Sequence, residues 1–140
     1  MFRLAALAGV LLFLVTACSS APAATGGGGG QLTATLTDSA VQLSQPSVQN
    51  GTVTITVKNV GSVNHTLEIL KTNLAPDKIP ADPNNAAKAD ERGKVGGTAA
   101  ELKPGESVDV KVDLTAGKYV LMCNLPGHYM IGMRTALTVN

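Results

Sequence analysis

The sequence has few aromatic residues and no tryptophan. Its 140 residues include two phenylalanines and two tyrosines. Phe2 and Phe13 both lie in an apolar segment at the N-terminus, so the rest of the chain has only Tyr119 and Tyr129 as aromatics. A chain of this length predicts one domain, and its core must be built mainly from Val, Leu, Ile and Ala.

The sequence also lacks an excess of charge of either sign. It contains 11 Lys and Arg against 10 Asp and Glu, and Arg3 belongs to the N-terminal segment. No basic patch is present, so the composition gives no support for nucleic-acid binding.

Long hydrophobic runs are limited to residues 4–15. This uncharged run follows Arg3 and ends in small residues directly before Cys18. The pattern predicts a secretion signal over residues 1–17, too short to span a bilayer permanently. Its end resembles a bacterial lipoprotein cleavage site, which predicts that Cys18 is lipidated. The mature protein would then be exported and anchored to the extracytoplasmic face of a bacterial membrane. The alternative is plain secretion of a soluble product.

The next segment, residues 18–31, is rich in Ser, Ala, Pro and Thr and contains five consecutive glycines at 26–30. Such a composition cannot build a core and predicts a flexible tether. The folded domain is therefore expected over residues 32–140.

Within that domain, apolar and polar residues alternate over residues 32–37, 52–58 and 107–113, and a last strand is expected over 135–139. Period-2 alternation predicts strands with one buried face. Many short strands separated by turn residues predict an all-β protein, a Greek-key β-sandwich of about seven to eight strands.

One segment, residues 71–97, interrupts this pattern. It carries three prolines and few large apolar residues. A short helix is expected over about residues 85–91, with Asp82 as a cap ahead of Pro83. The segment is either a solvated insertion or a flap that borders a functional site. The first interpretation is favoured, because no residue in it carries evident chemistry.

Cysteine is scarce, and its scarcity is informative. If Cys18 is lipidated, Cys123 is a lone thiol in an oxidising compartment, where a free thiol is liable to oxidation. Binding to a metal would protect it. The alternative is a buried, inert cysteine, which is common in cores.

Cys123 is followed at intervals of five residues by His128 and Met133. The only other histidine, His65, shares strand parity with Leu67 and therefore points to the apolar face. One thiolate, two imidazoles and a weak thioether are the ligands of a blue-copper site. The residues predict one type 1 copper bound by His65, Cys123, His128 and Met133.

Two other methionines fit the axial position less well. Met130 lies only two residues after His128, too close for an easy return to the metal. Met122 has the opposite strand parity to Cys123 and should pack elsewhere.

Residues 117–128, Gly-Lys-Tyr-Val-Leu-Met-Cys-Asn-Leu-Pro-Gly-His, followed by Gly132-Met133, resemble the blue copper (cupredoxin) family, which includes plastocyanin, azurin and auracyanin. The resemblance covers about residues 32–140 and implies a cupredoxin-like fold. It places Asn64 and Thr66 in the shell around the ligands, with the Thr66 N–H as a donor to the Cys123 sulfur.

By the same resemblance, His128 would be the exposed ligand through which electrons pass. An apolar patch for brief docking of partners would surround it. The residues expected in this patch are Leu125, Pro126, Tyr129 and Met130.

The function expected from these residues is single-copper electron transfer and not enzymatic catalysis. The partners would be redox proteins such as a membrane oxidoreductase or a cytochrome. One alternative is a copper storage or delivery protein without a redox partner, and another is a metal-free adhesion or structural sandwich. A multicopper enzyme is disfavoured, because two histidines are too few for further copper sites.

Overall fold

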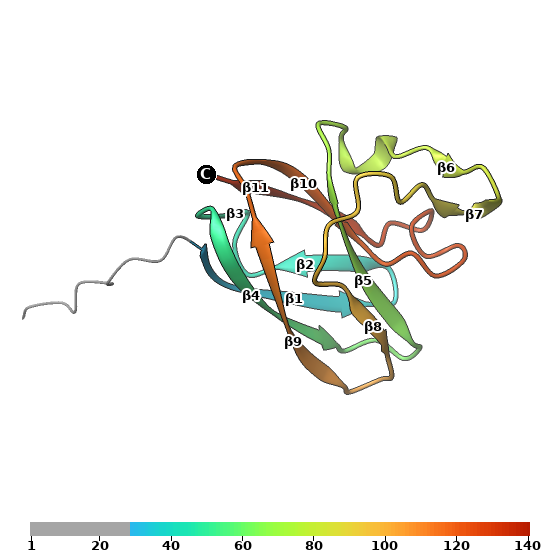
Figure 1. Cartoon of the computed structure of the whole chain (residues 1–140). Helices are drawn as coiled ribbons and strands as arrows, with labels where there is room; N and C mark the ends of the chain where they lie inside the picture. The colour runs from blue at the N-terminus through green and yellow to red at the C-terminus, as the bar shows by residue number, and fades with distance from the viewer. Residues whose placement is uncertain (1–28) are drawn as a thin grey trace, which may run out of the picture.

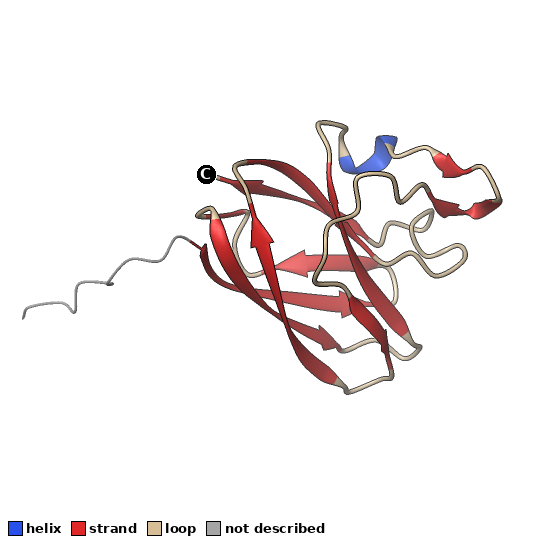
Figure 2. Cartoon of the chain, viewed as in Figure 1, coloured by secondary structure: helices blue, strands red, loops and turns tan. Residues whose placement is uncertain are grey.

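The computed structural model describes residues 29–140. The predicted signal, Cys18 and most of the predicted tether therefore lie outside the described residues. Within residues 29–140, eleven strands and one short 3-10 helix are present, and nine of the strands form two sheets packed as a sandwich (Figure 1 and Figure 2). This confirms the predicted all-β class. No helix in this part of the chain has the length and apolar character needed to cross a membrane.

The first sheet has the strand order β2-β1-β4-β9. Its strands are β1 (Gly29–Thr37), β2 (Ala40–Leu43), β4 (Gly51–Asn59) and β9 (Ser107–Leu114). β1 pairs in parallel with β4, and the other two pairings are antiparallel.

The second sheet has the order β3-β11-β10-β5-β8. Its strands are β3 (Ser47–Val48), β5 (His65–Lys71), β8 (Ala99–Leu102), β10 (Gly117–Met122) and β11 (Arg134–Val139). Because β4 and β5 follow each other in the chain but lie in different sheets, the loop between them crosses one end of the sandwich.

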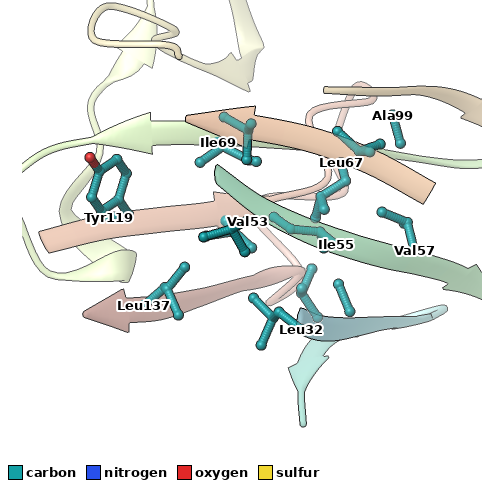
Figure 3. Close-up of a cluster of buried hydrophobic side chains, with 14 of the residues drawn as sticks. Leu32, Val53, Ile55, Val57, Leu67, Ile69, Ala99, Tyr119 and Leu137 are labelled. Atoms are coloured by element: carbon teal, nitrogen blue, oxygen red, sulfur yellow. The ribbon is translucent and has the colours of Figure 1, made fainter. Parts of the chain in front are cut away.

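The core lies between the sheets and consists of the inward-facing residues of both (Figure 3). Strand alternation places aliphatic side chains on this face, and Tyr119 is the one aromatic among them. The labelled members are Leu32, Val53, Ile55, Val57, Leu67, Ile69, Ala99, Tyr119 and Leu137. The aliphatic core expected from the composition is therefore confirmed.

The domain begins earlier than the sequence predicted. Gly29 pairs with Thr52 in the parallel ladder, so residues 29–31 belong to β1 and not to the tether. Gly29 has a φ of 124°, and a Cβ there would lie 2.0 Å from the Thr52 carbonyl oxygen. Only glycine permits this close approach of the two backbones.

The segment 71–97 also differs from its prediction. It contains the 3-10 helix η1 (Pro76–Lys78) and a hairpin of β6 (Ala81–Asp82) and β7 (Asn85–Ala89), so the helix expected over 85–91 is wrong. Asp82 Oδ1 accepts the N–H groups of Asn84 and Asn85, which closes the hairpin turn and does not cap a helix.

This segment covers the outer face of the second sheet and forms a second hydrophobic cluster with it. The cluster consists of Leu70, Ile79, Ala89, Val120, Met122 and Tyr129. Met122 thus packs away from the main core, as its parity predicts. The interpretation of residues 71–97 as a merely solvated insertion is wrong, because the segment buries apolar side chains.

Candidate metal centre

Three side chains from distant parts of the sequence converge at one end of the sandwich. His65 is the first residue of β5, Cys123 directly follows β10, and His128 lies in the loop of residues 123–133. The two Nδ1 atoms are 3.2 Å apart. Cys123 Sγ lies 3.8 Å from Nδ1 of His65 and 3.4 Å from Nδ1 of His128.

This triangle has the size that a metal ion requires. Its three edges leave a central point about 2 Å from each atom, close to metal–nitrogen and metal–sulfur bond lengths of about 2.0–2.3 Å. A thiolate with two imidazoles in a trigonal arrangement is the donor set of a blue-copper site. The three residues therefore fit one type 1 copper.

The site is closed to solvent except along one side. The side chains of His65 and Cys123 are fully buried, and His128 is half-buried. Burial lowers the pKa of His65, although the nearby Asp38 carboxylate opposes this shift. A lowered pKa keeps the imidazole neutral and its nitrogen available to a metal.

Met133 is held next to Cys123 by the closure of the ligand loop. The Cys123 N–H donates to the Met133 carbonyl at 3.0 Å, and the Met133 N–H donates to the His128 carbonyl at 3.2 Å. The Met133 side chain is fully buried in the same core cluster as Cys123. Its bond to the metal remains a prediction.

Thr66 contacts the cysteine sulfur. Its N–H donates to Cys123 Sγ at 3.3 Å, and its hydroxyl lies 3.7 Å from the same atom. Its Oγ1 also accepts the N–H of Asn124 at 3.3 Å. Asn64, predicted in the same shell, directs its amide to Glu101 on the surface at 2.6 Å.

Sequence reasoning missed Asn124, which joins the ligand loop to the hairpin segment. Its side chain accepts the Ala89 N–H at 2.8 Å and donates to the Ala89 carbonyl at 2.9 Å and to Glu91 at 2.8 Å. The Gly127 N–H adds a bond to the Ala87 carbonyl at 2.7 Å. The position of Asn124 directly after Cys123 was the only signal for it in the sequence.

Asn59 was also missed, and it braces the loop that leads to His65. It is 1% exposed and donates to the carbonyls of Val63 and Leu102 at 2.8 and 2.9 Å. Its Oδ1 accepts the Gly61 N–H at 2.9 Å. Nothing in the period-2 pattern distinguishes this asparagine from a strand terminus.

The predicted docking patch needs one correction. Tyr129 is only 7% exposed, because its hydroxyl donates to the Pro76 carbonyl and accepts the Ile79 N–H beneath the hairpin segment. Pro126 and Met130 are exposed, as predicted, and Leu125 is half-buried against the core. The neighbouring Ile131, which was not predicted, is 60% exposed.

Comparison with known proteins agrees with this geometry. A family model described as copper binding proteins, plastocyanin/azurin family, matches residues 29–140. The fold is similar to reduced auracyanin from Roseiflexus castenholzii, with 25% identity, 81% of this chain and 98% of that chain covered, and a TM-score of 0.57. Auracyanin A from Chloroflexus aurantiacus, a "blue" copper protein, gives 26% identity, coverage of 79% and 99%, and a TM-score of 0.52.

Rusticyanin from Thiobacillus ferrooxidans shares the fold at 18% identity, with 82% of this chain and 79% of that chain covered and a TM-score of 0.61. No individual curated protein sequence matches the chain.

Proposed function

Since the chain belongs to the plastocyanin/azurin family of copper-binding proteins, we propose that it cycles one type 1 copper between redox partners as a membrane-tethered electron carrier. The copper supplies one-electron chemistry when bound, by alternating between Cu(I) and Cu(II). Proteins of this family are generally electron carriers rather than enzymes.

The observation that carries the proposal is the closed, braced triangle of His65, Cys123 and His128. A catalytic metal site keeps a position open to substrate, whereas two of these ligands are fully buried. Thr66 and Asn124 hold the loop on both sides of the cysteine. A braced site favours electron transfer over copper storage or delivery, because release of the ion would require the ligands to move apart.

Electrons would enter and leave through the half-buried His128. Around it, Pro126, Met130 and Ile131 expose apolar surface, with Met130 at 63% and Ile131 at 60%. These residues are suited to brief apolar docking of a partner such as a membrane oxidoreductase or a cytochrome. A lipid on Cys18 would tether the protein to the membrane. The sequence pattern of residues 3–18 supports this.

A copper titration tests the metal site. Addition of Cu(II) to the domain should produce an intense blue thiolate-to-copper band that bleaches on reduction, and C123S should lack the band. Reversible voltammetry of the loaded protein would then favour a carrier. An absence of colour at saturating copper would contradict the proposal, and a blue but electrochemically irreversible site would favour storage or delivery.

Electron self-exchange between copies of the protein tests the docking surface without an identified partner. M130E should slow exchange between the Cu(I) and Cu(II) forms by about tenfold, because two like charges would meet at the contact. The reduction potential should not change. The matched control is L74E, since Leu74 is also exposed but follows β5 at the opposite end from His65. Equal slowing in both variants would refute docking at His128.

A further inference from the structure

A carboxylate lies behind the buried ligand His65, on the side of the ring that faces away from the other two ligands. Asp38 occupies the turn between β1 and β2, and its Oδ1 lies 3.4 Å from His65 Nε2. The opposite ring nitrogen, Nδ1, belongs to the ligand triangle. His65 therefore stands between the metal position and Asp38.

Asp38 is held in place by the loop that precedes His65. Its Oδ1 accepts the Ser62 N–H at 2.7 Å and its Oδ2 accepts the Ser62 hydroxyl at 2.8 Å. Two bonds to one residue fix the carboxylate, although its side chain is 51% exposed. The turn 37–40 and the loop 60–64 are thereby joined directly behind the ligand.

Gly61 leaves the space in which the two side chains meet. A Cβ at this position would lie 2.3 Å from Asp38 Oδ1 and 2.8 Å from His65 Nε2. Any larger residue would push the carboxylate and the ring apart.

In the part of the chain that the structure describes, the ring nitrogen Nε2 of His65 lacks a hydrogen-bond partner apart from Asp38. It is fully buried, and within residues 29–140 it forms no regular hydrogen bond. Asp38 Oδ1, at 3.4 Å, is the acceptor that lies within reach of it.

We propose that Asp38 is a positioning residue for the copper site, whose carboxylate takes the Nε2–H of His65 and so keeps Nδ1 free and directed at the metal. This inference rests on the copper site proposed above. A carboxylate partner raises the donor strength of a ligating imidazole, and its negative charge favours the more highly charged Cu(II) over Cu(I). Asp38 therefore lowers the reduction potential.

The variant D38N tests the charge. Asparagine retains the size of the side chain and one oxygen for Ser62, but it removes the anion. Loss of such outer partners costs about tenfold or more in metal affinity. If Cu(II) binding weakens about tenfold relative to Cu(I), the potential rises by about 59 mV for one electron.

The matched control is E101Q. Glu101 bonds to Asn64, next to His65 in the chain, and so the variant removes the same charge nearby without touching the ring. A rise of the potential in D38N alone supports the inference. An unchanged potential in D38N, or an equal rise in E101Q, overturns it.

A second variant, G61A, separates the pair while keeping every charge. Its Cβ would force Asp38 from the ring, and the potential should rise as in D38N. If D38N fails to fold, two other measurements still test the role of Asp38. They are the reduction potential of G61A and the nuclear magnetic resonance spectrum of the imidazole nitrogens in the metal-free wild type. That spectrum should show His65 protonated on Nε2, with the two Nδ1 atoms sharing a proton carried by His128.

The two proposals fail differently. A wild-type protein without a blue band contradicts the copper site. A blue wild type in which G61A leaves the potential unchanged, or in which His65 carries its proton on Nδ1, contradicts only the role of Asp38.

Discussion

At the scale of single residues, Met133 and Met122 are two fully buried methionines with different surroundings. Met133 lies beside Cys123 in the main core, whereas Met122 lies on the opposite face of β10 in the second cluster. The pair separates an effect on the copper from an effect on packing.

We expect M133L to keep the blue band and to raise the reduction potential. The axial thioether is a weak ligand that tunes the potential of a blue-copper site, and leucine cannot replace it. The two side chains have similar volumes, so the free energy of unfolding of the metal-free protein should fall by less than about 1.5 kcal/mol. Voltammetry and urea denaturation would measure the two effects.

The control is M122L, which makes the same substitution without touching the ligand loop. It should have a similarly small effect on stability and none on the potential. A potential that moves equally in both variants would mean that Met133 is a core residue only.

The sequence predicted those ligand residues that alternation or spacing can place. His65 could be assigned to the buried face because it shares parity with Leu67, and His128 follows Cys123 within one loop. Asp38 and Asn59 could not be found this way. Their roles depend on which loops meet in space, and a period of two residues carries no information about that.

At the scale of elements, the loop of residues 123–133 depends on the hairpin of β6 and β7. Asn124 makes the connection, because its buried amide satisfies both the N–H and the carbonyl of Ala89. Residues 71–97 therefore act as a brace for the ligand loop.

We expect N124A to lower the free energy of unfolding by about 1–3 kcal/mol, since it leaves two buried backbone groups of Ala89 without partners. Amide hydrogen exchange should accelerate across β7. Denaturation and exchange measurements on the metal-free protein would test both.

The control is N64A, which removes one hydrogen bond between exposed side chains. It should change stability by about 0.5 kcal/mol or less and leave exchange in β7 unaltered. If N124A were equally mild, the hairpin would not brace the loop.

A carboxylate in residues 71–97 predicts that the protein loses stability in acid. Hydrogen bonds from the Arg92 side chain and backbone hold the pKa of Asp90 below its ordinary value of 3.8. The unfolded state then binds a proton more readily than the folded state. The stabilisation is present well above the ordinary pKa of 3.8 and is lost as the pH falls through the lowered pKa of the folded state.

Urea denaturation of the metal-free protein between pH 2 and 6 would measure this loss as a slope of unfolding free energy against pH. D90N should flatten the slope, because it removes the titrating group without changing its size. An identical slope in D90N would show that other carboxylates, such as Asp38, account for the acid sensitivity.

The hairpin could not be predicted from its composition. β7 is short and consists of alanines with one asparagine and one lysine, and most of its residues are exposed or half-buried, so no alternation marks it as a strand. Ile79 and Ala89 of this segment pack on the outer face of the second sheet, a contact that the sequence pattern of residues 71–97 does not indicate.

At the scale of the whole molecule, the start of β1 and the metal centre lie at opposite ends of the sandwich. β1 runs from Gly29 to Thr37 (Figure 1). Asp38, which follows it, lies beside His65. Nine residues of strand span about 26–30 Å at 3.3 Å each. The sandwich itself could be predicted from alternation and turns. The position of the start of β1 at the end opposite the metal centre could not, because it follows from the contact of Asp38 with His65.

The predicted lipid anchor and the copper site should therefore be separable through the two cysteines. Expressed as the full chain, C18S should move from the membrane to the soluble fraction, because position 18 then has no thiol to carry the lipid. Its blue band and reduction potential should match those of the wild type, since the chain enters the domain far from His128. C123S should do the opposite, remaining with the membrane but lacking the band.

Cell fractionation, mass spectrometry of the mature N-terminus and visible spectra would measure the two variants side by side. A wild type without lipid mass, or a C18S protein that stays with the membrane, would contradict the anchor. A C18S protein with an altered potential would contradict the independence of the two ends. If each variant loses only its own property, the lipid anchor and the copper site are independent of each other.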